Sequence, residues 1–275
     1  MSSQADLHVH TTASDGQCTP EQVVEMARTL ALRAIAITDH ETTLGAWPAQ
    51  RAAQGTELCV VPGVEISVES PLGEVHMLGY FIERDADGLE ARLQKLREGR
   101  LERARRMLDK LAALGMPLSW ERVRELAAGE SVGRPHVARA MVEKGYVSTT
   151  DEAFALYIGS HGPAYVARMR VTPAEAIALI RRAHGVPVLA HPLRVADIVP
   201  VLARAGLQGL ETSYPGYTVE EVRYLQETAR KHGLVATGGS DYHGPQVMPV
   251  EMGAATVPFE AVEELKGRAQ GRAHE

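Results

Sequence analysis

The chain has 275 residues, of which 45% are hydrophobic, 23% charged and 5% aromatic, a composition that excludes a disordered or fibrous protein. The net charge of -6 gives no general basic field, so we expect no long duplex DNA and no membrane as partner, and any phosphate recognition must be local. Cys18 and Cys59 form no CxxC pair, and we find neither a leader pattern nor a run of about 20 apolar residues, which predicts a cytoplasmic protein.

The first 87 residues alternate short strand patterns with helical ones, as in an α/β domain with a largely parallel sheet. Thr19 and Pro20 are typical of the start of a helix. The strands expected here are 5–10, 34–38, 58–69 and 73–82, and the helices are 20–32 and about 43–54.

From residue 88 the pattern becomes almost entirely helical, and its first helix is predicted to end at Gly115, with Pro117 beyond it. Strand and helix patterns alternate again further on, in 171–185, 186–192, 195–206, 207–213, 219–233, 234–244 and about 259–268. We therefore predict one α/β barrel-like domain, residues 1–87 and 166–275, interrupted by an inserted helical domain at residues 88–165.

Histidine and acidic residues recur where predicted strands end, which is where α/β folds place their active sites. His8 and His10 are two apart on a strand, so both imidazoles project from one face and can chelate one ion. The other candidates at such positions are Asp15, Asp39, His40, Glu65, His76, His191, Asp241 and His243.

Each of these residues also has an ordinary structural explanation. Asp39 would cap a helix, Asp15 would make a turn, and His76 would be a hydrogen-bonded core histidine. The joint pattern of two paired motifs at opposite ends of the chain with acidic partners instead favours a multinuclear site of nitrogen and oxygen ligands. Cys18 and Cys59 are given no ligand role.

The ordered segments DLHVHTTASDG, ITDHET, PGVEIS, GEVHMLGY, AHP and GSDYHG resemble the PHP (polymerase and histidinol phosphatase) family of metal-dependent phosphoesterases. The resemblance implies a distorted seven-stranded α/β barrel that holds two to three divalent ions of Mn, Fe or Zn at the carboxyl ends of its strands. It also implies that a metal-bound hydroxide attacks the phosphate, with no side-chain nucleophile.

Carried over by position, the resemblance assigns three groups of ligands. His8, His10, Glu65 and Asp241 would hold the first ion; Glu65, His76 and His191 the second; and Asp15, His40 and His243 the third. Asp15 stands where several relatives have histidine, which makes the third site harder in ligand character. Asp39 would orient a ligand imidazole or have a purely structural role.

The helical insertion is the candidate for substrate recognition. Arg97, Arg100, Arg103 and Arg106 recur every three residues, so neighbouring pairs share a helix face. This pattern is typical of a solvated, salt-bridged face, or it offers guanidinium groups to phosphate oxygens. Arg134 and His136 likewise signal either a simple helix start or an anion site.

The arginine segments resemble the PHP subgroup that removes the 3'-phosphate of nucleoside 3',5'-bisphosphates and its relatives that trim RNA from the 5' end. The resemblance implies a small-molecule nucleotide substrate, such as adenosine 3',5'-bisphosphate, that is bound by Arg100, Arg103, Arg134 and His136. The alternatives are a 5'-3' exoribonuclease acting on short RNA, a histidinol phosphate phosphatase, and a non-catalytic metal-binding module.

Overall fold

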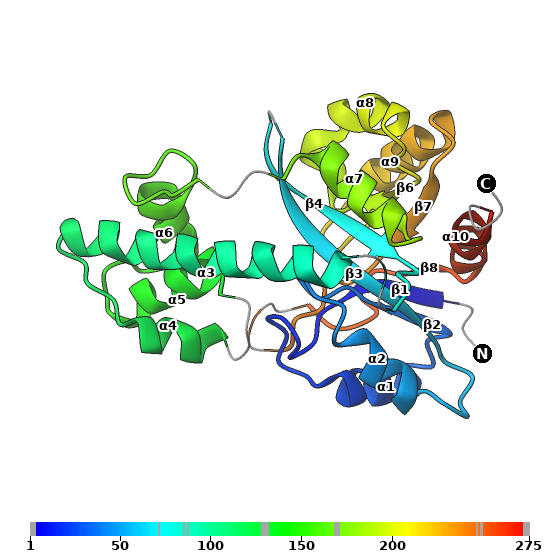
Figure 1. The fold of residues 1–275 in the computed structure, drawn as a ribbon, viewed down its shortest axis with the longest axis horizontal. Coiled ribbons are helices and arrows are strands. Elements are labelled where there is room, and N and C mark those ends of the chain that lie inside the picture. Colours follow the sequence, from blue (N-terminus) through cyan, green and yellow to red (C-terminus); the bar gives the residue numbers. More distant parts are fainter. Residues whose placement is uncertain are drawn as a thin grey trace. The chain divides into compact units, whose positions relative to one another are not determined.

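The computed structural model describes residues 4–70, 72–84, 86, 88–127, 132–167, 171–245, 247 and 250–271. The chain divides into two compact units, residues 1–91 with 171–275 and residues 92–170 (Figure 1). The sequence predicted an inserted helical domain at residues 88–165, and the second unit overlaps this range.

The first unit is built on one eight-stranded sheet with the order β7-β6-β5-β4-β3-β2-β1-β8. The strands are β1 (Gln4–Val9), β2 (Ala34–Ile37), β3 (Cys59–Ser70), β4 (Gly73–Tyr80), β5 (Val186–Leu189), β6 (Gly209–Ser213), β7 (Val235–Gly238) and β8 (Val257–Pro258). The His10 N–H donates to the carbonyl oxygen of Tyr242, 2.9 Å away, so the end of β1 meets the chain that follows β7. The predicted barrel is confirmed, but with eight described strands instead of seven.

The sheet is mixed, whereas the sequence predicted a largely parallel one. β3 and β4 pair antiparallel as a hairpin, β4 pairs antiparallel with β5, and β8 pairs antiparallel with β1. The other neighbours are parallel. The hairpin arises because only two residues separate β3 from β4, too few for the crossover that a parallel pair requires.

β3 runs without interruption through Pro62-Gly63, where the sequence suggested a break. Its first residues pair with β2 and its later ones with β4, so both neighbouring strands lie close to the chain at Gly63. A Cβ at Gly63 would lie 2.9 Å from the carbonyl oxygens of Ile37 and Gly79. Glycine therefore allows the strand to pass between its neighbours and carry Glu65 into the site.

Helices cover the sheet of the first unit, with α1 and α2 on one side and α7 to α9 on another (Figure 1). They are α1 (Pro20–Thr29), α2 (Ala46–Ala52), α7 (Pro173–Arg182), η2 (Pro192–Ile198), α8 (Val199–Arg204), α9 (Val219–Lys231) and α10 (Glu260–Gln270). As predicted, Thr19 caps α1, and Gln22 completes a capping box.

The alternation along β2 places its side chains in two apolar clusters. Ile35 and Ile37 belong to a cluster that includes Val23 of α1, whereas Ala34 and Ala36 belong to one that includes Leu265 of α10. This period-two pattern fixes the register of the strand because a shift by one residue would exchange the two faces.

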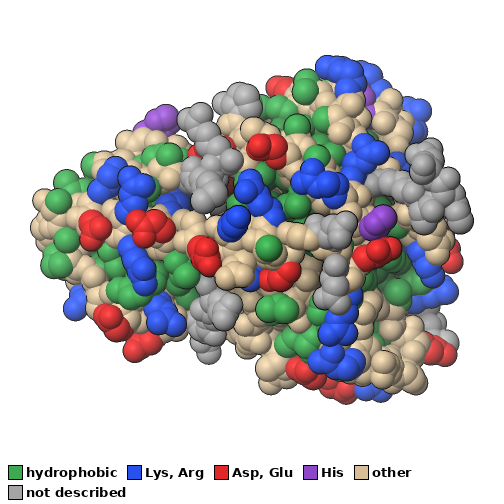
Figure 2. Space-filling model, in the orientation of Figure 1, with side chains coloured by type: hydrophobic (Ala, Val, Ile, Leu, Met, Phe, Trp, Pro, Cys, Tyr) green, Lys and Arg blue, Asp and Glu red, His purple; other side chains and the backbone are tan. Residues whose placement is uncertain are grey.

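The described residues of the second unit form helices and connecting segments, with no strand. It contains most of α3 (Leu89–Ala113), then α4 (Trp120–Ala127), α5 (Arg134–Glu143), α6 (Thr150–Ala153) and the π-helical turn η1 (Phe154–Ile158). Met107, Leu111, Val123 and Met141 belong to its own buried core. Figure 2 shows acidic and basic side chains interspersed over the visible face. Of the helices that the structure describes, none combines the length and the apolar character that a bilayer crossing requires.

Candidate metal centre

His8 and His10 lie at the carboxyl end of β1 and are both fully buried, with ring centroids 5.2 Å apart. Each Nε2 atom lies 3.2 Å from Oδ1 of Asp241. The distances from these atoms to Oε2 of Glu65 are 3.4 Å for His8 and 3.2 Å for His10. The four residues expected around the first ion thus converge, and their candidate ligand atoms all lie within 4.8 Å of one another.

A second group shares Glu65 with the first. Nδ1 of His76 lies 2.8 Å from Oε1 of Glu65, and Nδ1 of His40 lies 3.1 Å from Oε2. The sequence placed His191 with Glu65 and His76, and its Nε2 lies 3.2 Å from Nδ1 of His76 and 3.6 Å from Oε1 of Glu65. The compact group is nevertheless His40, Glu65 and His76, with His191 beside it.

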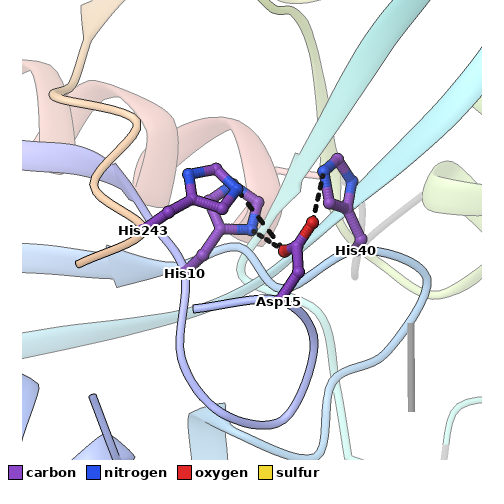
Figure 3. A group of neighbouring side chains, drawn as sticks. All are labelled: His10, Asp15, His40 and His243. Atoms are coloured by element: carbon purple, nitrogen blue, oxygen red, sulfur yellow. Dashed lines mark ion pairs between the residues drawn. The ribbon is translucent and has the colours of Figure 1, made fainter. Parts of the chain in front are cut away.

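A third group surrounds Asp15 (Figure 3). Its Oδ1 lies 3.4 Å from Nε2 of His243 and 3.7 Å from Nδ1 of His10, and its Oδ2 lies 3.8 Å from Nε2 of His40. The sequence placed Asp15, His40 and His243 together but kept His10 for the first ion only. In the structure His10 directs Nε2 toward Glu65 and Nδ1 toward Asp15, so it lies between two groups.

The donor set fits divalent cations. Nε2 of His8, both ring nitrogens of His10 and both carboxylate oxygens of Glu65 are buried without a hydrogen-bond partner. Such atoms are costly to bury unless a metal or an ionic partner satisfies them. Nitrogen and oxygen donors without thiolates are suited to Mn, Fe or Zn ions. They are not the donors of a structural thiolate site.

The charges of the cluster depend on one another. Burial would raise the pKa of Glu65, but the imidazoles of His76 and His40 hold it well below its ordinary range. Burial would lower the pKa of His76, but Glu65 raises it to about 9. Burial acts in the same way on His243, and Asp15 and Asp241 raise its pKa to about 10. In the metal-free protein, protons therefore supply the positive charge that these carboxylates require.

Metal loading should release these protons, because an imidazole must be neutral to bind a metal. His76 and His243 are protonated below pH about 9 and about 10, so metal affinity should rise as the pH increases from 7 toward 9. Calorimetric titration in buffers with different ionisation enthalpies would count the released protons. Loading without proton release at pH 7 would contradict this charge assignment.

Asp39 is fully buried, and its carboxylate supports the loop that carries Asp15. It accepts hydrogen bonds from the Thr11 N–H at 2.7 Å, the Thr11 hydroxyl at 2.8 Å and the Ser14 hydroxyl at 2.7 Å. The sequence left open whether Asp39 orients a ligand imidazole or has a purely structural role. These contacts connect Asp39 to residues 11–14, which precede Asp15 in the chain.

Three buried carboxylates, Asp6, Glu41 and Glu211, were not expected from the sequence, and Asp6 and Glu211 support the candidate ligands directly. Asp6 accepts from the Ser240 N–H at 2.9 Å and the Ser240 hydroxyl at 2.6 Å, which fixes the chain just before Asp241. Oε1 of Glu211 lies 2.9 Å from Nδ1 of His8, and its Oε2 accepts the His191 N–H at 2.7 Å. A single carboxylate inside each apolar strand was the available signal.

The four expected substrate-binding residues lie in the second unit, and the nine expected metal ligands lie in the first. Arg100 and Arg103 on α3 are each only 8% exposed, unlike a solvated face. Nε of Arg103 donates to the Val166 carbonyl at 2.8 Å. Arg134 lies over the Phe154 ring, 5.4 Å from its centroid. Nδ1 of His136 accepts the Gly133 N–H at 2.9 Å and thus caps α5.

Comparison with known proteins agrees with this geometry. The PHP domain model matches residues 6–89. The chain is 34% identical to a 3',5'-nucleoside bisphosphate phosphatase of Chromobacterium violaceum over 87% of both proteins. It is also 34% identical to the 5'-3' exoribonuclease Rnm of Escherichia coli, over 87% of the chain and 85% of the relative. A crystal structure from Bifidobacterium adolescentis, assigned to the metal-dependent phosphoesterases, superimposes with a TM-score of 0.84 over 96% of each chain at 32% identity.

A barrel with clustered histidines and carboxylates at its strand ends, together with relatives of this identity and coverage, places the chain in the PHP family. The chain is a phosphoesterase enzyme of that family, with candidate sites for divalent metal ions. The predicted family and enzyme class are thereby confirmed.

Proposed function

We propose that this enzyme removes the 3'-phosphate of nucleoside 3',5'-bisphosphates and leaves the 5'-monophosphate. The observation that carries the proposal is the set of three adjacent ligand groups joined by shared residues, Glu65 and His10 among them. The relative named as a 3',5'-nucleoside bisphosphate phosphatase, 34% identical over 87% of both chains, supports this substrate class.

The three groups would hold two to three ions of Mn, Fe or Zn. When bound, such ions activate a water molecule and neutralise the non-bridging phosphate oxygens. Glu65 has two oxygens directed toward different histidines, so this one carboxylate would supply an oxygen to each of two ligand groups. The Tyr214 hydroxyl donates to Oδ2 of Asp241 at 2.9 Å and leaves Oδ1 directed toward His8 and His10.

A bisphosphate substrate has a second, non-reacting phosphate that needs its own cationic partners. We assign this role to Arg100, Arg103, Arg134 and His136. Arg100 and Arg103 suit it because both residues are only 8% exposed, and the attraction between a guanidinium group and phosphate oxygens is stronger in buried surroundings than in water.

Replacing Arg134 with alanine should raise KM for adenosine 3',5'-bisphosphate and lower kcat/KM by about 10- to 100-fold, since one charge-assisted contact contributes about 1.5 to 3 kcal/mol. Hydrolysis of p-nitrophenyl phosphate, which lacks a second phosphate, should fall much less. Steady-state kinetics on both substrates measures the difference.

The matched control is Arg124→Ala, at an exposed arginine of α4 in the same unit. This variant should behave as the wild type on both substrates. Equal proportional losses on the two substrates in Arg134→Ala would assign Arg134 to the fold and remove support for the bisphosphate substrate.

The second candidate function is 5'-3' exoribonuclease activity on short RNA. It is supported by the exoribonuclease Rnm of Escherichia coli, whose identity to this chain equals that of the bisphosphate phosphatase. The two functions differ in kcat/KM for 5'-phosphorylated trinucleotides and for mononucleoside bisphosphates. A wide preference for the trinucleotide would establish the exoribonuclease, with the same arginines binding the 5'-phosphate.

A further inference from the structure

A cavity of about 440 Å³ lies in the first unit beside the metal centre. Of the site residues predicted from the sequence, His191 is the one that lines this cavity. Its walls come from the chain after β5, the chain after β6 and the beginning of β4. The residues that matter for its chemistry are Glu74, His191, Arg194, Tyr214, Tyr217 and Glu221.

The cavity is next to the candidate metal ligands. His191 contacts Glu65 and His76 on one side and lines the cavity on the other. The Tyr214 ring lies edge-on to His191, with centroids 5.5 Å apart, while its hydroxyl donates to Asp241. A substrate whose phosphate lies at the metal centre would therefore extend its remaining part along this wall.

The cavity offers an aromatic surface. The rings of Tyr214 and Tyr217 are 5.3 Å apart and tilted by 47°. The Tyr217 hydroxyl accepts the Leu193 N–H at 3.4 Å, a long contact that still anchors the side chain to the η2 segment. Two partly exposed tyrosines beside a polar site are suited to stacking against a planar ring.

The charged residues that line the cavity determine which kind of planar ring it can bind. Two acidic residues, Glu74 and Glu221, and one basic residue, Arg194, line the cavity. Oε2 of Glu221 also accepts the Thr218 N–H at 2.7 Å. A second phosphate would meet net negative charge here, whereas a neutral ring with amino groups could donate hydrogen bonds to the carboxylates. The volume is within the usual range for a small-molecule site, roughly 300 to 1,000 Å³.

We propose that this cavity is the nucleobase subsite, in which Tyr214 and Tyr217 stack against the base while the reacting phosphate lies at the metal centre. This inference rests on the proposed function for the identity of the substrate. It adds that base recognition belongs to the first unit, separate from the arginines assigned to the remote phosphate.

The test compares ligands with and without a base. Wild-type protein should bind AMP about 10- to 100-fold more tightly than ribose 5-phosphate in calorimetric titration, the range that stacking on one aromatic surface supplies. Tyr217→Leu removes the ring but keeps an apolar side chain, and it should reduce this preference to less than threefold. Tyr217→Phe keeps the ring and should retain the preference, which separates stacking from a folding defect.

The control is Tyr224→Leu, at a tyrosine of α9 that is 49% exposed and does not line the cavity. Its preference for AMP should equal that of the wild type. An unchanged preference in Tyr217→Leu, or equal wild-type affinity for the two ligands, would overturn the nucleobase assignment.

A kinetic comparison separates failure of this inference from failure of the proposed function. Adenosine 3',5'-bisphosphate and its base-free ribose analogue should differ in kcat/KM for the wild type, and Tyr217→Leu should lose that difference. If neither compound releases phosphate, the proposed function is overturned. The nucleobase subsite is then still decided by the AMP binding measurement.

Discussion

Replacing Glu65 with glutamine should lower turnover by at least 100-fold and reduce the metal content by at least one ion per chain. Oε2 of Glu65 lies within 3.4 Å of ring nitrogens of His8, His10 and His40, and its Oε1 lies 2.8 Å from Nδ1 of His76. Glutamine keeps the shape but has one oxygen and no charge, so it cannot serve two ligand groups. A 100-fold loss corresponds to about 2.7 kcal/mol of transition-state stabilisation.

Elemental analysis of the purified variant and steady-state kinetics together measure this effect. The matched control is Glu57→Gln, at an exposed glutamate just before β3, which should keep both the metals and the rate. Full metal content with an undiminished rate in Glu65→Gln would remove the bridging assignment. Circular dichroism before and after metal removal would show whether the variant is folded.

The sequence predicted much of the centre because its ligands come in local patterns. His8 and His10 alternate on one strand, and Asp241 and His243 repeat that spacing at the last strand end. The resemblance implied that Glu65 is shared between two ligand groups, but the sharing of His10 was not predictable. His10 faces both Glu65 and Asp15 because the strands converge in the closed barrel, and a linear pattern carries no information about that convergence.

The direction of β4 and the existence of β8 show a similar limit. The strands expected at 58–69 and 73–82 left only a short connection between them, which indicates a hairpin, but the alternating strand and helix patterns favoured a parallel sheet. β8 contains only Val257 and Pro258, which is too short to produce a periodic pattern. Its strand character comes from pairing with Gln4 and Ala5.

The arginines of the insertion show that a charge pattern typical of an exposed helix face can belong to buried residues. Spacing by three residues among glutamates is typical of a solvated helix face. Arg100 and Arg103 are nevertheless buried. Arg103 lies near the Tyr165 ring and donates to the Val166 carbonyl, and both of these residues come from a distant part of the chain. His136 makes a structural capping contact in addition to its proposed role, and α5 begins at Arg134 as the helix-start signal indicated.

Glu211 was missed because a single glutamate in a short apolar strand has no sequence periodicity, yet its position predicts a large effect. Its two oxygens contact two of the expected metal ligands, Nδ1 of His8 and the backbone N–H of His191. When Nδ1 of His8 carries the proton and donates it to Glu211 in a hydrogen bond, Nε2 keeps its lone pair, which is directed toward Glu65 and Asp241. The second contact holds His191 in a left-handed conformation with φ 30°.

Replacing Glu211 with glutamine should weaken metal binding by about 10- to 100-fold, the usual cost of losing a carboxylate that orients a ligand histidine. An amide has one acceptor oxygen, so its NH₂ group must face either His8 or His191. Facing His8, it would favour the tautomer in which Nε2 carries the proton and cannot bind a metal. Facing His191, it would set two donors against each other and release the left-handed backbone.

Competition with a chelator would measure the metal affinity of Glu211→Gln, and ¹⁵N NMR of the imidazoles would report the tautomer of His8. Glu227→Gln, at an exposed glutamate of α9, is the control and should match the wild type in both measurements. Because the defect is one of affinity, excess metal should restore part of the turnover, whereas a folding defect would not respond. An unchanged metal affinity together with an unchanged His8 tautomer would show that Glu211 does not orient the ligands.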